Sequence, residues 1–511
     1  MTNASLKSPS DTQDVDTFQA ADLNRGLHYH ENLLWEKQRS DHSGVDMTQP
    51  KNTPLRTGQN ARGDIGLPQV SEPQVVRHFV RLSTKNYSID SGFFPLGSCT
   101  MKHNPRLNEK MARLPGFAHI HPLQPASTVQ GALQLMHELQ QWLGELTGLP
   151  GVCLTPAAGA HGELAGIMTI ARAHQAKGNT HKKVILVPDS AHGTNPATAA
   201  MCGFDLRVIP TREGGRVTLD AFKTALGDGH DVAGMMVTNP NTCGLFERDI
   251  QEISRLLHDA GGYFYCDGAN FNALVGKIRP ADFGVDVMHI NLHKTFSTPH
   301  GGGGPGSGPI CVTEELAQYM PKPIVIHNND TYRLEAETDR PMNCGRIKGF
   351  AGQFGMHIRA LTYMMSHGSD GLRQVSEDAV LNANYILSQL KQDYHVPFDG
   401  PCMHECLLTD KVQKDVGVTT LDIAKALVEH GFHPMTVYFP LVVQGAMLIE
   451  PTETESKDAL DRFIRVMKKI ASDVRNGDVD KFHSYPQSAP TRRLDEVRAA
   501  REPKLRWKGQ Q

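Results

Sequence analysis

The 511-residue sequence contains no run of 18 or more apolar residues, so we expect no membrane-spanning helix. It also lacks an excess of basic charge, because 52 Lys and Arg oppose 55 Asp and Glu, for a formal net charge of −3. A nucleic-acid-binding protein uses a positive field to displace counterions from phosphates. The charge balance therefore argues against a nucleic-acid partner.

The first 24 residues lack the features of a targeting segment. They contain one Lys, no Arg and four Asp, and they have no apolar stretch. A secretory signal needs a basic start and an apolar core, and a mitochondrial transit peptide is rich in arginine. We therefore expect a cytoplasmic protein.

Cysteine forms no paired pattern: nine residues, an odd number, are scattered through the chain. This distribution fits reduced thiols better than a disulfide framework. Only Cys402 and Cys406, which flank His404, are close enough to suggest a metal site. Structural zinc usually needs a second ligand pair at a defined spacing, so we predict no metal.

The sequence also lacks internal repeats and low-complexity tracts. Its 39% hydrophobic and 21% charged residues, with 47 glycines, are typical of a globular α/β enzyme. Composition and element patterns predict four parts. These are an extended N-terminal arm (1–60), a large α/β domain (61–345) with a long loop (85–105), a smaller C-terminal α+β domain (346–485) and a basic tail (486–511).

The predicted large domain alternates apolar strands with helical segments, and polar residues follow the strands. Residues 152–154, 183–188, 232–238 and 263–266 read as strands, and helices are expected at 129–146, 164–173 and 250–258. This order predicts an α/β fold with a mostly parallel sheet. Such sheets bind ligands at the carboxyl ends of their strands.

Lys294 follows the predicted buried strand at 287–292 and precedes a glycine-rich run. Gly301 to Gly304 remove every Cβ from a stretch of backbone, which lets that stretch approach another surface closely. A lysine in this position can hold a carbonyl cofactor as a Schiff base.

The other strand ends carry the groups that a pyridoxal-phosphate site needs besides its lysine. Asp267 can keep the pyridine nitrogen protonated, His192 can stack on the ring, and the small-residue turn from Ala158 to Gly162 can hold the phosphate at a helix N-terminus. Each residue also has an ordinary explanation: a solvated lysine, an aspartate in a turn, a loop histidine and a turn built for packing. Their occurrence at successive strand ends favours the cofactor site.

The sequence contains several long and specific motifs: SGFFPLGSCTMKHNP (91–105), GAHGELAG (159–166), SAHGTNPAT (190–198), YCDGANFNALVG (265–276), NLHKTFSTPHGGGGPGSGP (291–309), LIEPTETES (448–456) and RRLDEVRAAR (492–501). With these motifs the chain, from about residue 33 to the C-terminus, resembles the P-protein of the glycine cleavage system, glycine dehydrogenase (decarboxylating). In that family the enzyme is either one chain of two homologous halves or two separate subunits. This chain is too short for the fused form and carries the lysine motif, so it resembles subunit 2.

The resemblance implies a fold-type-I pyridoxal-phosphate enzyme, an oxidoreductase of the glycine dehydrogenase (aminomethyl-transferring) class. Glycine would lose carbon dioxide, and the remaining aminomethyl group would pass to the lipoyl group of H-protein. The implied partners are subunit 1, with two copies of each subunit in the assembly, and lipoylated H-protein.

The resemblance also assigns site residues. Lys294 is implied to carry the cofactor covalently, Asp267 to face the pyridine nitrogen and His192 to stack on the ring. His192 or His293 could carry protons, since imidazole titrates in the working range. Asn270 is implied to contact the phenolic oxygen, His293 and Thr295 to flank the lysine, and Ala158, Gly159 and Ala160 to form the phosphate turn. His161 departs from the family pattern, which leaves its role open.

Two other functions remain open at this stage. Another pyridoxal-phosphate reaction, transamination or cysteine desulfuration, would use the same fold. A desulfurase would need a nucleophilic cysteine, for which Cys99 and Cys243 are candidates. A non-catalytic structural subunit is the third possibility, and Lys294 argues against it.

Overall fold

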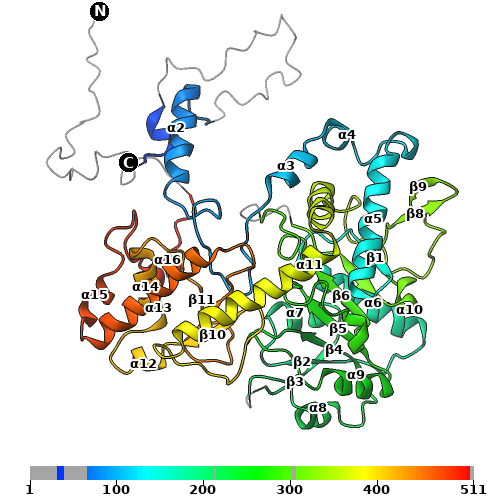
Figure 1. Ribbon diagram of the computed structural model, residues 1–511. Coiled ribbons are helices and arrows are strands. Elements are labelled where there is room, and N and C mark those ends of the chain that lie inside the picture. The colour runs from blue at the N-terminus through cyan, green and yellow to red at the C-terminus, as the bar shows by residue number, and fades with distance from the viewer. Residues whose placement is uncertain (1–30, 39–65, 212–213, 301–305, 507–511) are drawn as a thin grey trace, which may run out of the picture. The chain divides into compact units, whose positions relative to one another are not determined.

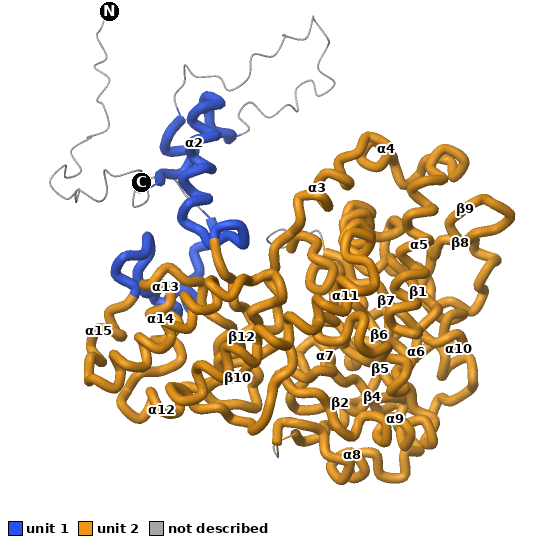
Figure 2. The backbone as a smooth tube through the Cα atoms, viewed as in Figure 1, with its two compact units in different colours: residues 1–91, 486–511 blue, residues 92–485 orange. Residues whose placement is uncertain are grey.

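The computed structural model describes residues 31–38, 66–211, 214–300 and 306–506, and the chain divides into two units (Figure 2). The first contains residues 1–91 and 486–511, and the second contains residues 92–485. Most of the predicted N-terminal arm lies outside the described residues. The described helices of the first unit are α1 (Leu34–Lys37), α2 (Glu72–Ser83) and α16 (Glu496–Arg501).

A seven-stranded sheet forms the centre of the second unit (Figure 1). Its order is β1-β7-β6-β5-β4-β2-β3, and all neighbours from β6 to β3 are parallel, whereas β7 is antiparallel to both of its neighbours. The predicted mostly parallel α/β fold is therefore confirmed. The strands are β1 (Gly151–Cys153), β2 (Val184–Pro188), β3 (Asp205–Ile209), β4 (Val232–Thr238), β5 (Tyr263–Gly268), β6 (Val287–Ile290) and β7 (Ile310–Val312).

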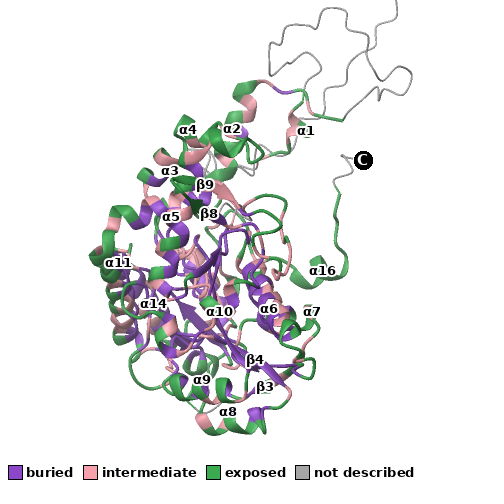
Figure 3. Ribbon diagram, turned by 90° about the vertical axis from the view of Figure 1, so that its right-hand side faces the viewer, coloured by how far each residue is buried: buried purple, intermediate pink, exposed green. Residues whose placement is uncertain are grey.

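Apolar side chains on both faces of the sheet build two cores, seen as the buried central strands of Figure 3. Along β2, Val184 and Leu186 belong to one core and Ile185 and Val187 to the other. This alternation follows from the two-residue period of a strand, and it explains why the strands read as continuous apolar runs. The helices beside the sheet are α5 (Gln130–Thr147), α6 (Gly159–Ala176), α7 (Thr194–Met201), α8 (Leu219–Leu226), α9 (Ile250–Asp259) and α10 (Glu314–Ala317).

The helix expected to begin at about Leu164 in fact begins at Gly159. Its first turn is made of small residues that packing requires. A Cβ at Gly162 would lie 2.6 Å from the carbonyl oxygen of Gly308, so the turn can pack against that segment only without a side chain. The small-residue turn is thus part of the helix.

The last third of the second unit contains α11 (Phe354–Leu390) and a three-stranded antiparallel sheet of order β10-β12-β11. The apolar spacing of the sequence predicts two helices here, at 356–365 and 372–390, and Gly368, with φ 65° and ψ −175°, interrupts α11 between them. The predicted domain boundary at residue 345 lies within the second unit and stays a prediction. The elements are β10 (Cys406–Thr409), α12 (Lys411–Lys414), α13 (Thr420–Glu429), β11 (Thr436–Val437), β12 (Ala446–Ile449), α14 (Lys457–Arg475) and α15 (Val479–Ser484).

The remaining elements of the second unit are short. They are α3 (Arg106–Ala112), α4 (Pro115–Ala118), two 3-10 helices (Ala126–Thr128 and Pro280–Phe283), β8 (Val325–Asn328) and β9 (Thr331–Leu334).

None of the helices in the described ranges combines the length and apolar character that crossing a bilayer requires.

Candidate active site

A cavity of about 230 Å³ lies at the carboxyl ends of β4, β5 and β6. Thr238, Asp267 and His289 are paired across these three strands in register, and all three line the cavity. Lys294 lines it as well, four residues after the end of β6. The parallel sheet therefore brings the predicted lysine and carboxylate together.

The Lys294 ammonium is held by a loop from the beginning of the second unit. Its Nζ donates a hydrogen bond to the carbonyl oxygen of Ser98, at 2.7 Å. Residues 92–105 form neither helix nor strand, as predicted, and a single bridge pairs Leu96 with Ile449. This loop is consequently part of the cavity wall.

Asp267 is the buried carboxylate of the site, with 4% of its surface exposed. Its Oδ2 accepts a hydrogen bond from Asn195 Nδ2 at 2.9 Å, its Oδ1 accepts one from the Ala269 backbone at 3.0 Å, and His289 Nε2 lies 3.5 Å away. Burial alone would raise the pKa of Asp267, but His289, these donors and Lys294 together lower it. Asp267 is thus held as an anion.

A second carboxyl group, Glu163 of α6, is linked to Asp267 through Asn195. The Asn195 amide donates to Glu163 Oε2 at 2.9 Å, and the Thr194 hydroxyl donates to Glu163 Oε1 at 2.7 Å. Thr194 also contacts His192 Nδ1 at 2.7 Å. Burial and the nearby Asp267 carboxylate raise the pKa of Glu163 to about 7. The site therefore contains a buried carboxyl group that can carry a proton at neutral pH.

Five buried polar atoms at the cavity have no hydrogen-bond partner among the described residues: Thr238 Oγ1, His289 Nε2, Asn291 Oδ1 and both ring nitrogens of His404. Buried polar atoms in folded proteins are nearly always paired, so such a group indicates a polar ligand. Beside them, Gly159 begins α6, and a Cβ there would lie 2.7 Å from Asn291 Oδ1. The free N–H groups of this helix N-terminus can receive an anion.

The structure places six of the nine predicted site residues in the cavity lining: Lys294, Asp267, His192, Gly159, Ala160 and Asn270. The other three, Ala158, His293 and Thr295, are adjacent in sequence to lining residues. Gly301 to Gly304 lie outside the described residues.

His293 lies edge-on to His300, with 5.0 Å between ring centroids. Burial and the nearby His300 lower its pKa to about 3, so it is a neutral imidazole. Thr295 Oγ1 accepts a hydrogen bond from the Phe271 backbone at 2.9 Å, and His161 Nδ1 accepts one from the Ala157 backbone at 3.1 Å. Thr295 and His161 thus order the loops around the cavity.

Sequence reasoning missed several residues of the site. Glu163 is in an apolar helix, and its only sequence signal was its place in the motif GAHGELAG (159–166). His404 and Glu405 line the cavity, and Glu450 lies beside them, although all three come from the C-terminal third of the chain. The only sequence signal for His404 was its position between Cys402 and Cys406, whose thiols are buried and free.

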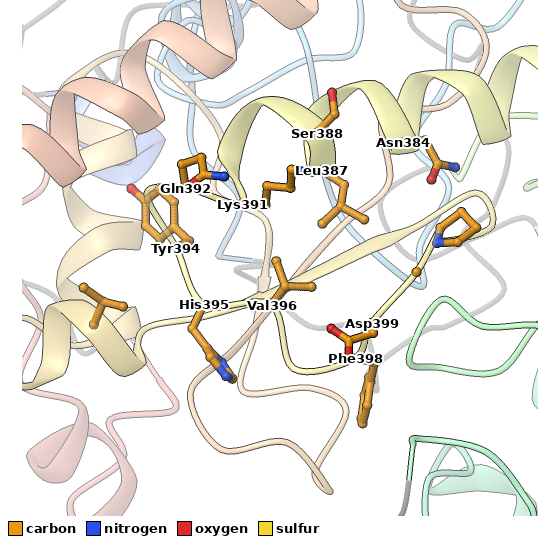
Figure 4. Close-up of a pocket in the computed structure, with 13 residues that line it drawn as sticks. Asn384, Leu387, Ser388, Lys391, Gln392, Tyr394, His395, Val396, Phe398 and Asp399 are labelled. Atoms are coloured by element: carbon orange, nitrogen blue, oxygen red, sulfur yellow. The ribbon is translucent and has the colours of Figure 1, made fainter.

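A second, more open cavity of about 660 Å³ lies at the C-terminal end of α11 (Figure 4). Leu387, Ser388 and Lys391 line one side of it, and Tyr394, His395 and Asp399 line the other. None of the predicted site residues contributes to it, so the chemistry is assigned to the cavity at Lys294.

Comparisons with known proteins show similarity to two family models and to named relatives. The family described as "Aminotransferase class-V" matches residues 161–338, and that described as "Glycine dehydrogenase, C-terminal domain" matches residues 375–491. Two curated relatives are both named "Probable glycine dehydrogenase (decarboxylating) subunit 2". The one from Caulobacter vibrioides is 59% identical over 95% of this chain and 93% of its own length. The one from Caldanaerobacter subterraneus subsp. tengcongensis is 53% identical over 87% of this chain and 90% of its own length.

A solved structure of glycine decarboxylase (P-protein) of the glycine cleavage system, in inhibitor-bound form, has a similar fold. The comparison of the two structures gives a TM-score of 0.68 and a sequence identity of 22%. It covers 81% of this chain and 93% of that chain.

Proposed function

The chain belongs to the family of glycine dehydrogenase (decarboxylating) subunit 2, and on this premise we propose that it catalyses the pyridoxal-phosphate-dependent decarboxylation of glycine. The aminomethyl group that remains after carbon dioxide leaves is transferred to the lipoyl group of H-protein. One observation carries the proposal: Lys294 and Asp267, delivered by the adjacent strands β6 and β5, line a single cavity.

The residues of this cavity fit pyridoxal phosphate. Lys294 would supply the amine that binds the carbonyl carbon of the cofactor. Asp267 would supply a buried anion for the ring nitrogen of the cofactor, and His192 would supply an imidazole ring at the cavity wall. The N-terminus of α6 at Gly159 and Ala160 supplies N–H donors for a phosphate, and the unpartnered Asn291 Oδ1 and Thr238 Oγ1 supply further polar contacts. When bound, this cofactor supplies an electron sink for the pair released by the breaking bond.

The chain's own residues then have distinct tasks. Asp267 stays ionised because His289 and Asn195 stabilise its negative charge, and Asn195 also ties it to Glu163. Lys294 would hold the cofactor through its side-chain amine, would give up that position to the amine of glycine, and would hold or release a proton at Nζ. Ser98 positions that Nζ through its carbonyl oxygen. His192, at the mouth of the site, is the histidine that we assign to proton movement, since it lines the cavity and His293 does not.

The proposal includes partners. The family name identifies the chain as one of two kinds of subunit, so we propose an assembly with subunit 1, two copies of each, and lipoylated H-protein as the acceptor. The aminomethyl carbon attacks one sulfur of the lipoyl disulfide. The other sulfur leaves as a thiolate and takes a proton, so the disulfide is reduced as the C–S bond forms.

Two observations argue against a cysteine desulfurase. Cys243 is 2% exposed, and burial raises its pKa to about 12, so its thiol is not nucleophilic at neutral pH. Burial also raises the pKa of Cys99. Neither cysteine has the depressed pKa that an attacking thiolate needs.

The test is exchange of labelled bicarbonate into the carboxyl group of glycine, using this chain with subunit 1, pyridoxal phosphate and lipoylated H-protein. We expect exchange that Lys294→Ala abolishes. The matched control is Lys277→Ala, which removes an exposed lysine paired with Glu377. Absence of exchange in the wild-type assembly, with the cofactor bound, would assign the site to a different amino-acid reaction.

A further inference from the structure

His404 and Glu405 form one end of the cavity and have no role in the function described so far. They precede β10, and they are 2% and 4% exposed. Neither ring nitrogen of His404 has a hydrogen-bond partner among the described residues. A buried imidazole with two unpaired nitrogens in the wall of a cavity indicates a polar ligand that is still to be bound.

The backbone at these residues is fixed from two sides. The Met403 N–H donates to the Gly244 carbonyl oxygen at 2.8 Å, and the Ser98 N–H donates to Glu405 Oε1. Gly244 has φ +75°, and a Cβ there would overlap the Glu405 carbonyl oxygen. Ser98 is also the residue whose carbonyl oxygen holds the Lys294 ammonium. The segment is therefore positioned relative to Lys294.

Both side chains are uncharged at neutral pH. Burial and the nearby Lys294 lower the pKa of His404 to about 3, so its ring is neutral. Burial and the Glu450 carboxyl group raise the pKa of Glu405 to about 8. Glu450 Oε1 already accepts hydrogen bonds from Thr100 Oγ1 at 2.8 Å and Asn270 Nδ2 at 2.9 Å, so Glu405 is the member of the pair that carries the proton. Before a substrate carboxylate binds, Glu405 shares that proton with Glu450 in a hydrogen bond.

Resting on the proposed function, we propose that His404 and Glu405 bind the carboxylate of the amino-acid substrate, through the N–H of a neutral imidazole and the O–H of a protonated carboxyl group. The two donors line the same cavity as the Lys294 amine, where the substrate's amine must react, and Ser98 contacts both Glu405 and Lys294. No arginine is found among the described residues that line the cavity, so an ion pair with a guanidinium is not available there.

Neutral donors suit decarboxylation. The bond between the carboxyl carbon and the α-carbon breaks, its electron pair stays with the α-carbon, and the carboxylate becomes uncharged carbon dioxide. A guanidinium would stabilise the charged carboxylate more than the departing neutral molecule, and so would raise the barrier. As neutral hydrogen-bond donors, His404 and Glu405 orient the carboxylate with a smaller penalty than a guanidinium would impose.

A divalent cation is the competing occupant, because one ligand atom each of His404, Glu405 and Glu450 lies within 4.8 Å of the others. The neighbouring Lys294 ammonium and the proton on Glu405 both oppose a cation at this position. We therefore favour the substrate carboxylate.

The experiment compares glycine with methylamine, which has the same amine but no carboxylate. Each is titrated into the cofactor-loaded assembly with subunit 1, and the absorbance of the bound cofactor reports binding. We expect His404→Leu to weaken glycine binding about 10-fold or more, because a hydrogen bond to a charged group is lost. Methylamine binding should change less than about twofold, since methylamine makes no such bond.

Further variants separate a local effect from a general one. His357→Leu is the matched control, because this histidine of α11 is also buried with unpartnered ring nitrogens but does not line the cavity. The ratio of the dissociation constants for glycine and methylamine should therefore be unchanged in this variant. If His404→Leu does not fold, two variants of Glu405 test the same proposal. Glu405→Gln, which keeps a donor, should retain the ratio at pH 7, and Glu405→Leu should lose it.

Three outcomes would contradict the assignment of His404 and Glu405 to the substrate carboxylate, each in a different way. Binding of both amines, with the ratio unchanged in the His404 and Glu405 variants, would overturn this assignment and leave the proposed function intact. Loss of glycine binding on chelation, restored by Zn²⁺ or Mn²⁺, would assign the residues to a cation instead. No spectral response of the wild-type assembly to either amine would overturn the proposed function, and this assignment with it.

Discussion

Lys102 and Glu453 form a buried ion pair, with 2.7 Å between Nζ and Oε1 and less than a tenth of either side chain exposed. The same ammonium donates to the carbonyl oxygen of Thr295, also at 2.7 Å. Thr295 follows Lys294 directly. The pair thus connects the loop at 92–105, the segment after β12 and the turn that carries Lys294.

Removing one member of this pair should destabilise the protein. Lys102→Met leaves the Glu453 carboxylate buried without its cation, which should lower the free energy of unfolding by about 3–5 kcal/mol. The double variant Lys102→Met/Glu453→Gln removes both charges and should recover part of the loss. Thermal unfolding of the wild type, both single variants and the double variant measures this as a double-mutant cycle. A coupling free energy near zero would contradict it.

Asp267→Asn should abolish most glycine exchange. An amide cannot hold the negative charge that His289 and Asn195 stabilise, and loss of one preorganised electrostatic partner lowers the rate about 100-fold or more. Bicarbonate exchange measures the effect, and the absorbance of bound cofactor shows whether binding survives. Asp282→Asn, which changes an exposed carboxylate paired with Arg279, is the control. Near-normal exchange by Asp267→Asn would remove this residue from its assigned role.

The preference for glycine over methylamine should fall as the pH rises through about 8. Below that value Glu405 is protonated and donates a hydrogen bond to the substrate carboxylate, and above it the ionised group repels that carboxylate. The other titratable groups near Glu405 are Glu450, His404, Lys294 and the thiols of Cys99, Cys243, Cys402 and Cys406, and burial raises the pKa of each of these thiols. The ratio of dissociation constants from pH 6.5 to 9 checks the effect. Glu405→Gln cannot ionise, so its ratio should be flat, and an equal pH dependence in this variant would assign the titration elsewhere.

Gly244→Ala should displace the His404–Glu405 segment. The new Cβ would overlap the Glu405 carbonyl oxygen, whereas Gly431 has a similar φ, +82°, with nothing near its Cβ position. Both substitutions place alanine in a left-handed conformation and should lose about 1–3 kcal/mol of stability. Only Gly244→Ala should also weaken glycine binding relative to methylamine. Equal effects of the two variants on that ratio would mean that strain alone is responsible.

The elements of the large sheet follow from local patterns. Apolar runs bounded by turn residues predict the strands, and the three-to-four spacing of leucines predicts α5, whose end at Gly148 requires φ 72°. The parallel order places strand ends at one edge of the sheet. That is why Lys294, Asp267 and His192, 102 positions apart at most (294 − 192), could be assigned to one site from sequence.

The rest of the site depends on contacts between residues that no local pattern links. Ser98 and Glu405 are 307 residues apart, and Lys102 and Glu453 are 351 apart, yet each pair is in hydrogen-bond contact. Whether a buried glutamate is charged depends on the carboxylates and donors around it, which for Glu163 and Glu405 come from other segments. Residue type and spacing thus determined the sheet, the lysine and its carboxylate partner. Only the tertiary structure decided which distant side chains enclose them and with what charge, because burial and electrostatics act through space and not along the chain.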